Sequence, residues 1–136
     1  MKKTLVLGAL LNLAGVAMPA YANDNLRTEN RQDIVLGTTS KMQKGTSLTE
    51  TIHVARAVGR LSEIIFVAKA NYAQIDQIVV ELGNGEVLTE GPMTLREDDY
   101  FVMDLSRYGD YVRRIEITGQ TGNLIGPRAL VEVRGR

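Results

Sequence analysis

The chain has 136 residues, with 16 Lys and Arg against 16 Asp and Glu, so it carries no net charge when its single histidine is neutral. Proteins that bind the phosphate backbone of nucleic acid usually carry a clear excess of basic residues, which disfavours that class of function. The chain has no cysteine, and this excludes disulfides, thiol chemistry and cysteine-ligated metal sites.

The N-terminal residues predict export. Lys2 and Lys3 precede a mostly apolar run over residues 5–16, and residues 19–22, Pro-Ala-Tyr-Ala, end in the small-x-small pattern that signal peptidase cleaves. We therefore expect a signal peptide over residues 1–22 and a product in the periplasm or secreted. The apolar run is shorter than the ~20 residues of a spanning helix, so we expect no membrane span after cleavage. Cleavage removes two of the 16 basic residues, which leaves a net charge of about −2.

The first part of the mature chain predicts a short lead-in followed by strands. Residues 23–32 are polar and predict a flexible N-terminal segment. The alternation of apolar and polar residues predicts strands over residues 33–39 and 49–54, with His53 facing away from the core. Residues 55–60 are ambiguous. Residues 61–70 are apolar at both odd and even positions, so both faces of a strand here would be apolar. This is typical of a central strand covered on both faces or of a strand at a crowded edge of the core.

Residues 75–88 predict a β-hairpin. Ile78, Val80 and Leu82 alternate with polar or smaller residues and so mark a core face. The following Gly83-Asn84-Gly85 predicts a tight type I′ turn, which needs positive φ at both central residues. The partner strand, residues 86–89, is expected to end at Gly91-Pro92, since proline cannot donate to a sheet.

The remaining residues predict three more strands. Residues 97–99 form a polar turn, residues 101–105 alternate again, and residues 111–118 place Ile115 and Ile117 inward. Residues 119–127 contain three glycines and a proline and predict a long connection. The last strand is expected over residues 128–134, with Val131 and Val133 buried.

This spacing of strands and turns predicts the fold class. About eight short strands without a convincing helix indicate an all-β, single-domain antiparallel β-sandwich over residues 33–136. The connections vary in length, which favours a jelly-roll-like sandwich. The pattern alone leaves a small β-barrel as the alternative.

One cluster of aromatic and basic residues is the best candidate binding site. Guanidinium groups beside tyrosines can hold an anionic sugar, a phosphate or a partner's carboxylate. The alternative is that these side chains only cover the rim of the core with their stems. The candidate residues are Arg107, Tyr108, Tyr111, Arg113 and Arg114.

Other candidates for chemistry are weaker. His53 is the only histidine, so a His-rich zinc site is excluded. The acidic residues Glu97, Asp98 and Asp99, with Asp104, offer oxygens to calcium, but their spacing matches no calcium loop and favours a solvated turn. Neither glycine-rich segment has the lysine and the following helix of a phosphate loop. We therefore expect no catalytic residue, no metal and no cofactor.

Three features carry a resemblance to a known group of proteins. They are Asn84-Gly85 after a hydrophobic strand, the strand end Met103-Asp104-Leu105, and the basic-hydrophobic strand over residues 113–117. With the leader, the region from about residue 34 to 135 resembles a family of small exported proteins of Gram-negative bacteria classed as a domain of unknown function. The resemblance implies a periplasmic β-rich domain and supplies no catalytic residues.

These observations favour an exported, non-enzymatic binding or accessory protein whose partner is an envelope protein or an anionic glycan. The alternative is a structural or assembly protein that associates through exposed strand edges. The sequence does not determine the oligomeric state.

Overall fold

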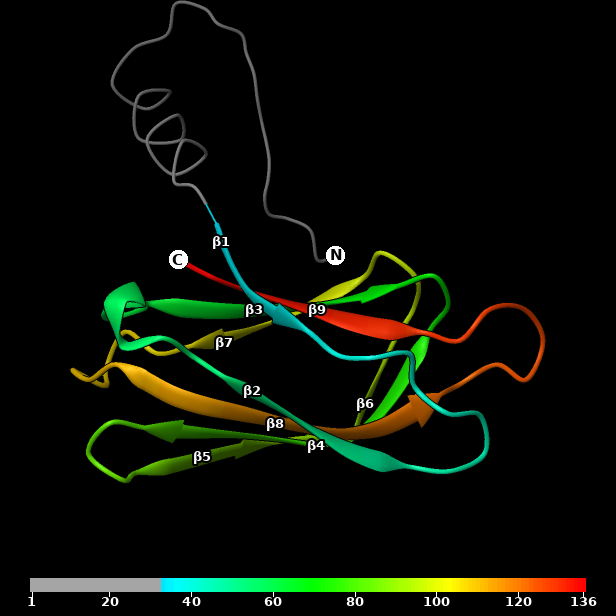
Figure 1. The fold of residues 1–136 in the computed structure, drawn as a ribbon, viewed down its shortest axis with the longest axis horizontal. Helices are drawn as coiled ribbons and strands as arrows, with labels where there is room; N and C mark the ends of the chain where they lie inside the picture. The colour runs from blue at the N-terminus through cyan, green and yellow to red at the C-terminus, as the bar shows by residue number, and fades with distance from the viewer. Residues whose placement is uncertain (1–32) are drawn as a thin grey trace, which may run out of the picture. The chain divides into compact units, whose positions relative to one another are not determined.

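The structure is a computed structural model that describes residues 33–136. The predicted signal peptide, residues 1–22, and the predicted flexible segment, residues 23–32, lie outside the described residues. The described chain forms nine strands and one 3₁₀ turn (Figure 1), which are β1 (Ile34–Thr38), β2 (Leu48–His53), the turn Arg56–Val58, β3 (Glu63–Lys69), β4 (Ala73–Leu82), β5 (Val87–Glu90), β6 (Met93–Leu95), β7 (Tyr100–Asp104), β8 (Val112–Thr121) and β9 (Leu130–Gly135).

The strands form two antiparallel sheets that pack as the layers of a sandwich (Figure 1). One sheet has the order β1-β9-β3-β7. The other has the order β2-β8-β4-β5, with β6 also paired to β4. The all-β sandwich prediction is confirmed, and the sheets do not close into a barrel. Within residues 33–136, no helix is long and apolar enough to cross a bilayer.

The strand pairing is that of a jelly roll. Strands β5 and β6 both pair with β4, so they act as one interrupted edge strand and the fold has eight strand positions. The pairs β1–β9, β2–β8, β3–β7 and β4–β5 are nested in sequence, as in a long hairpin folded over onto itself. The jelly-roll-like prediction is therefore confirmed as well.

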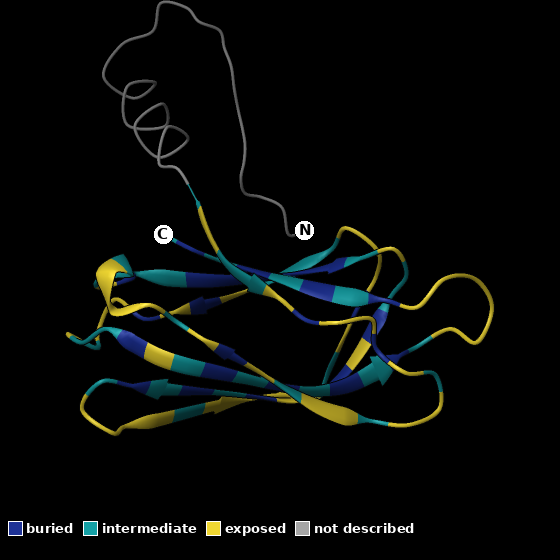
Figure 2. Cartoon of the chain, in the orientation of Figure 1, coloured by how far each residue is buried: buried dark blue, intermediate teal, exposed yellow. Residues whose placement is uncertain are grey.

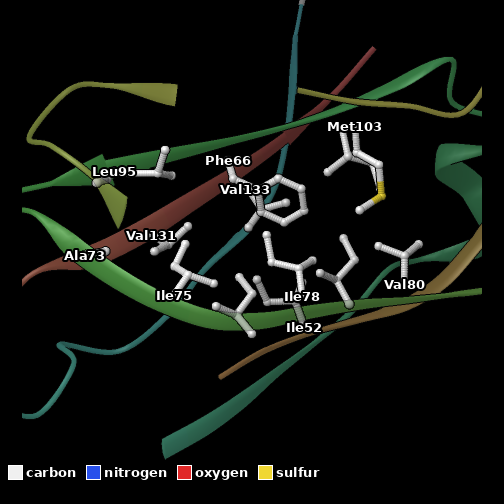
Figure 3. Close-up of a cluster of buried hydrophobic side chains, with 14 of the residues drawn as sticks. Ile52, Phe66, Ala73, Ile75, Ile78, Val80, Leu95, Met103, Val131 and Val133 are labelled. Atoms are coloured by element: carbon white, nitrogen blue, oxygen red, sulfur yellow. The ribbon is translucent and has the colours of Figure 1, made fainter. Parts of the chain in front are cut away.

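Apolar side chains from both sheets fill the space between the layers (Figure 3), and buried residues recur along the strands of both sheets (Figure 2). Phe66 on β3 is fully buried, and its ring centroid lies 6.2 Å from that of Phe101 on β7. Every residue from Ile64 to Ala68 is buried, and β3 lies between β9 and β7. The central-strand interpretation of residues 61–70 is thus the correct one.

The hairpin after Leu82 is confirmed, but the predicted turn type is wrong. Gly85 has a φ of +90°, whereas Asn84 is not in the left-handed region, so the two positive φ values of a type I′ turn are not present. Gly85 N donates to Leu82 O at 3.0 Å, and Leu82 N donates to Glu86 O at 2.9 Å. This is the pattern of a three-residue loop that ends in a left-handed glycine.

The end of one strand and the presence of another differ from the predictions. Strand β8 runs on to Thr121, because Gly119 pairs with Ile75 instead of starting a loop. A Cβ at Gly119 would lie only 2.6 Å from Gln74 O, so glycine here serves close strand packing and not a turn. The short strand β6 was not predicted, and it pairs with the start of β4 beyond the interruption at Gly91.

Candidate functional site

All five predicted binding residues lie at one end of the sandwich, in the β7–β8 connection or at the start of β8. The β2–β3 connection, residues 54–62, and the β4–β5 connection, residues 83–86, reach the same end (Figure 1). Arg60 forms a backbone bridge with Tyr111, and Gly83 N donates to Tyr111 O at 2.8 Å. We call these two connections, residues 105–111, Arg113 and Arg114 together the arginine end.

Tyr111 lies at the centre of the arginine end. A Cβ on Gly83 would lie 2.3 Å from Tyr111 Cε1, so the tyrosine ring packs directly over this glycine. Arg56 Cζ lies 4.6 Å from the centroid of the same ring. A guanidinium group at this distance is held by a cation–π interaction, and its N–H groups stay available to a ligand.

A β-bulge gives Arg113 and Arg114 a common partner. Neighbouring residues in a regular strand face opposite sides of the sheet. Here Arg114 stands opposite Glu81 and Val112 stands opposite Leu82, so Arg113 is the extra residue. Both guanidinium groups consequently reach the Glu81 carboxylate.

The contacts of these two arginines are with the protein itself. Arg113 Nη1 donates to Glu81 Oε2 at 3.1 Å, and its Nη2 donates to Gly83 O at 2.8 Å. Arg114 Nε donates to the other Glu81 oxygen, and Arg114 Nη1 donates to Glu116. The hydrogen bond from Arg114, with the charges of both arginines, lowers the pKa of Glu81 although partial burial opposes the shift. Two carboxylates therefore balance the two arginines.

Tyr108 lies in the arginine end and also lines a second feature. It packs against the core and lines an open groove of about 490 Å³ between the edge strands β5 and β7. Val87 and Val102, which are 53% and 37% exposed, give this groove part of its apolar lining. All five predicted residues thus lie in the arginine end, and Tyr108 also lines this groove, which we call the edge groove.

Arg107 is exposed in the β7–β8 connection, near Asp104. The pKa of Asp104 is lowered mainly by the hydrogen bond that Ser106 N donates at 2.9 Å, and the charge of Arg107 adds to this shift. No ion pair joins Arg107 to a carboxylate in the part of the chain that the structure describes.

Three arginines of the arginine end have no carboxylate partner within residues 33–136: Arg56, Arg60 and Arg107. Sequence reasoning missed Arg56 and Arg60, because they lie far from Tyr111 in the chain and on a segment of ambiguous pattern. The only feature of the sequence that could have pointed to these two arginines is their position on either side of Gly59, a residue that favours a turn. Arg56 and Arg60 lie beside Tyr111, and Arg107 is exposed on the neighbouring β7–β8 connection, so this end offers guanidinium groups to anionic ligands.

The weaker candidates lie elsewhere. His53 is exposed, as predicted, and stands opposite Arg114 in the register. Asp98 pairs with Lys69 at 3.4 Å, and Asp99 N donates to Arg96 O at 2.9 Å, so residues 96–99 form a turn. Among the described residues, no group of three or more His, Asp or Glu side chains is placed to hold a metal ion.

A second depression of about 550 Å³ lies at the opposite end of the sandwich, where Tyr72 and Arg96 line it.

No protein-family model, curated protein or solved structure matches the chain. The candidate site therefore rests on the geometry of its own residues.

Proposed function

We propose that this protein is an exported, non-enzymatic binding protein that holds an anionic partner, an anionic glycan or an acidic face of an envelope protein, at the arginine end. The leader supports export, since its charged, apolar and small-residue parts are those of a signal peptide. The observation that carries the binding proposal is the guanidinium of Arg56 on the Tyr111 ring, 4.6 Å from its centroid, beside Arg60.

The chemistry of the arginine end favours carboxylate or sulfate groups spaced along a chain. Arg56, Arg60 and Arg107 each offer several N–H donors in a planar fork, which suits bidentate recognition of such groups. Arg113 and Arg114 form ion pairs with the carboxylates of Glu81 and Glu116. Their positive charges are therefore neutralised, and they do not add to the charge offered by the other three arginines.

A binding measurement with an alginate oligosaccharide, a chain of carboxylated sugars, tests this proposal. Replacing Arg56, Arg60 and Arg107 together by alanine is expected to weaken binding about tenfold or more, which corresponds to ~1.4 kcal/mol. The matched control replaces three cations at the opposite end by alanine, namely Lys41, Arg96 and Arg128, and is expected to change binding less than about twofold. Equal losses in the two triple variants would show non-specific charge attraction and overturn the assignment.

Export is tested separately by fractionation and N-terminal sequencing of the processed chain. A mature protein that begins at Asn23 and is found outside the cytoplasm supports the proposal. A chain that keeps Met1 and stays in the cytoplasm contradicts it.

The edge groove favours a second candidate function, assembly through strand edges. Strands β5 and β7 each pair on one side only, and the groove between them exposes Val87 and Val102. An added strand from another chain would satisfy these free edges. Light scattering tests this second function by measuring the molar mass in solution. A concentration-dependent oligomer that the Val102→Lys variant no longer forms supports assembly through strand edges. A stable monomer rejects it.

A further inference from the structure

The loop between β8 and β9 displays two aliphatic side chains to solvent. Leu124 is 72% exposed and Ile125 is 81% exposed, more than any other large hydrophobic residue of the described chain. They lie on the connection that projects from the end of the sandwich opposite the arginine end (Figure 1). We call Leu124 and Ile125 the aliphatic tip.

The backbone of this loop is held from below by two side chains. Lys44 Nζ donates to Leu124 O at 3.1 Å and also to Gly126 O. Asn71 Nδ2 donates to Ile125 O at 3.2 Å and to Pro127 O at 2.8 Å. Four consecutive carbonyl oxygens are therefore bonded within the protein.

Further contacts hold the first part of the loop, residues 122–125. Ile125 N donates to Asn123 Oδ1 at 3.0 Å, and Gly122 N donates to Tyr72 O at 2.9 Å. The Tyr72 ring lies so close to Gly122 that a Cβ there would be 2.1 Å from Cε2. The exposure of the tip is thus built into the fold and does not come from a loosely held segment.

Satisfied backbone carbonyls matter most where no water can reach them. In the hydrocarbon part of a bilayer, an unbonded carbonyl is costly, so a segment that enters lipid must satisfy its backbone internally. A protruding tip with apolar side chains and internally bonded carbonyls fits this requirement.

The charges around the tip complement an anionic surface. The β1–β2 connection, residues 39–47, and the β8–β9 connection, residues 122–129, together contain three basic residues and no Asp or Glu. Met42 N donates to Ala129 O at 2.7 Å, so Lys41 and Arg128, which adjoin this pair in the sequence, both lie at the foot of the loop. Basic residues next to an apolar tip are attracted to anionic lipid headgroups.

We propose that the aliphatic tip docks the protein on an anionic lipid bilayer, with Leu124 and Ile125 inserted at the interface and Lys41 and Arg128 against the headgroups. This site is separate from the arginine end. A protein docked in this way presents the arginine end away from the lipid.

The first experiment uses the absence of tryptophan from the chain. Ile125→Trp places a single fluorophore on the tip, and Val35→Trp places one at another exposed site as the control. The protein is the chain that begins at Asn23, because the leader would itself bind lipid, and both sheets lie within residues 34–136. With phosphatidylethanolamine vesicles that contain phosphatidylglycerol, we expect a blue shift and quenching by brominated lipid for Ile125→Trp only. Unchanged emission at low salt would overturn the proposal.

The second experiment measures co-flotation with the same vesicles. Replacing Leu124 and Ile125 together by serine is expected to lower vesicle binding about tenfold or more, whereas Val35→Ser leaves it unchanged. Lys41→Gln with Arg128→Gln is expected to lower binding to anionic vesicles and to flatten its salt dependence. Unchanged binding by the double serine variant would refute tip insertion, whatever the outcome of the alginate measurement.

Discussion

Gly119 is the position where one added methyl group best tests the packing of the two central strands of the five-stranded sheet. It lies on β8 opposite Ile75 of β4, with its backbone in ordinary extended geometry. A Cβ at this position would lie 2.6 Å from Gln74 O, 3.0 Å from Met42 Cε and 3.1 Å from Ile75 Cα. Two of these three atoms are backbone atoms of β4, so they cannot move without shifting that strand.

The expected cost of Gly119→Ala follows from this overlap. The contact with Gln74 O is 0.8 Å shorter than the 3.4 Å at which ordinary contact begins. Overpacking of this kind costs ~1–3 kcal/mol. The lower conformational entropy of the unfolded alanine variant offsets roughly 0.4–1 kcal/mol of that. The net loss in free energy of unfolding is therefore about 1–2 kcal/mol, or roughly 5–15 °C in Tm.

Gly109→Ala is the matched control, because no heavy atom lies within 4 Å of the Cβ it would add and its φ is not in the left-handed region. We expect this variant to be as stable as the native chain, or more stable by up to ~1 kcal/mol. Urea unfolding followed by circular dichroism compares the three proteins. If Gly119→Ala and Gly109→Ala unfold at the same urea concentration, the close approach of β8 and β4 is refuted.

Two further predictions concern the charged and looped parts of the sandwich. The pKa of Glu81 is lowered in the folded state, so its stabilisation is complete above the ordinary value of 4.5 and is lost as the pH falls through the folded pKa. When urea unfolding is repeated at decreasing pH, the free energy of unfolding of the Glu81→Gln variant should therefore fall less than that of the native chain. An identical decrease in the two proteins would contradict the stabilisation of the Glu81 carboxylate by the two arginines. Asn71→Ala removes two bonds to loop carbonyls, at about 1 kcal/mol each, so tryptic cleavage after Arg128 should be roughly 5–30 times faster. An unchanged rate would show that Asn71 does not hold the loop.

The strands could be predicted from the sequence because side-chain alternation is a local property. Ile78, Val80 and Leu82 mark the core face of β4 without knowledge of its neighbours, and all three are fully buried. The same local reasoning failed at Gly119, where glycine serves a close approach between strands. A glycine in a turn and a glycine between two strands look alike in the sequence.

The candidate site could be predicted only in part. Tyr111, Arg113 and Arg114 are neighbours in the chain and were found together. The Glu81 partner of these arginines depends on the strand register and on the bulge at Arg113, which no pattern within β8 reveals. Arg56 reaches Tyr111 because two separate connections meet at one end of the sandwich.

The sequence by itself determined the strand periodicity, the all-β sandwich class and the basic-aromatic character of the β7–β8 connection, whereas the nested strand order of the jelly roll came from the structure. Only the tertiary structure decided which arginines are balanced by carboxylates and which stay exposed, and that Lys44 and Asn71 hold the carbonyls beneath Leu124 and Ile125. The physical reason is the distance along the chain over which each feature is set. Alternation follows from the geometry of adjacent peptide units, whereas ion pairs and carbonyl contacts depend on which distant segments the sheets bring within hydrogen-bond distance.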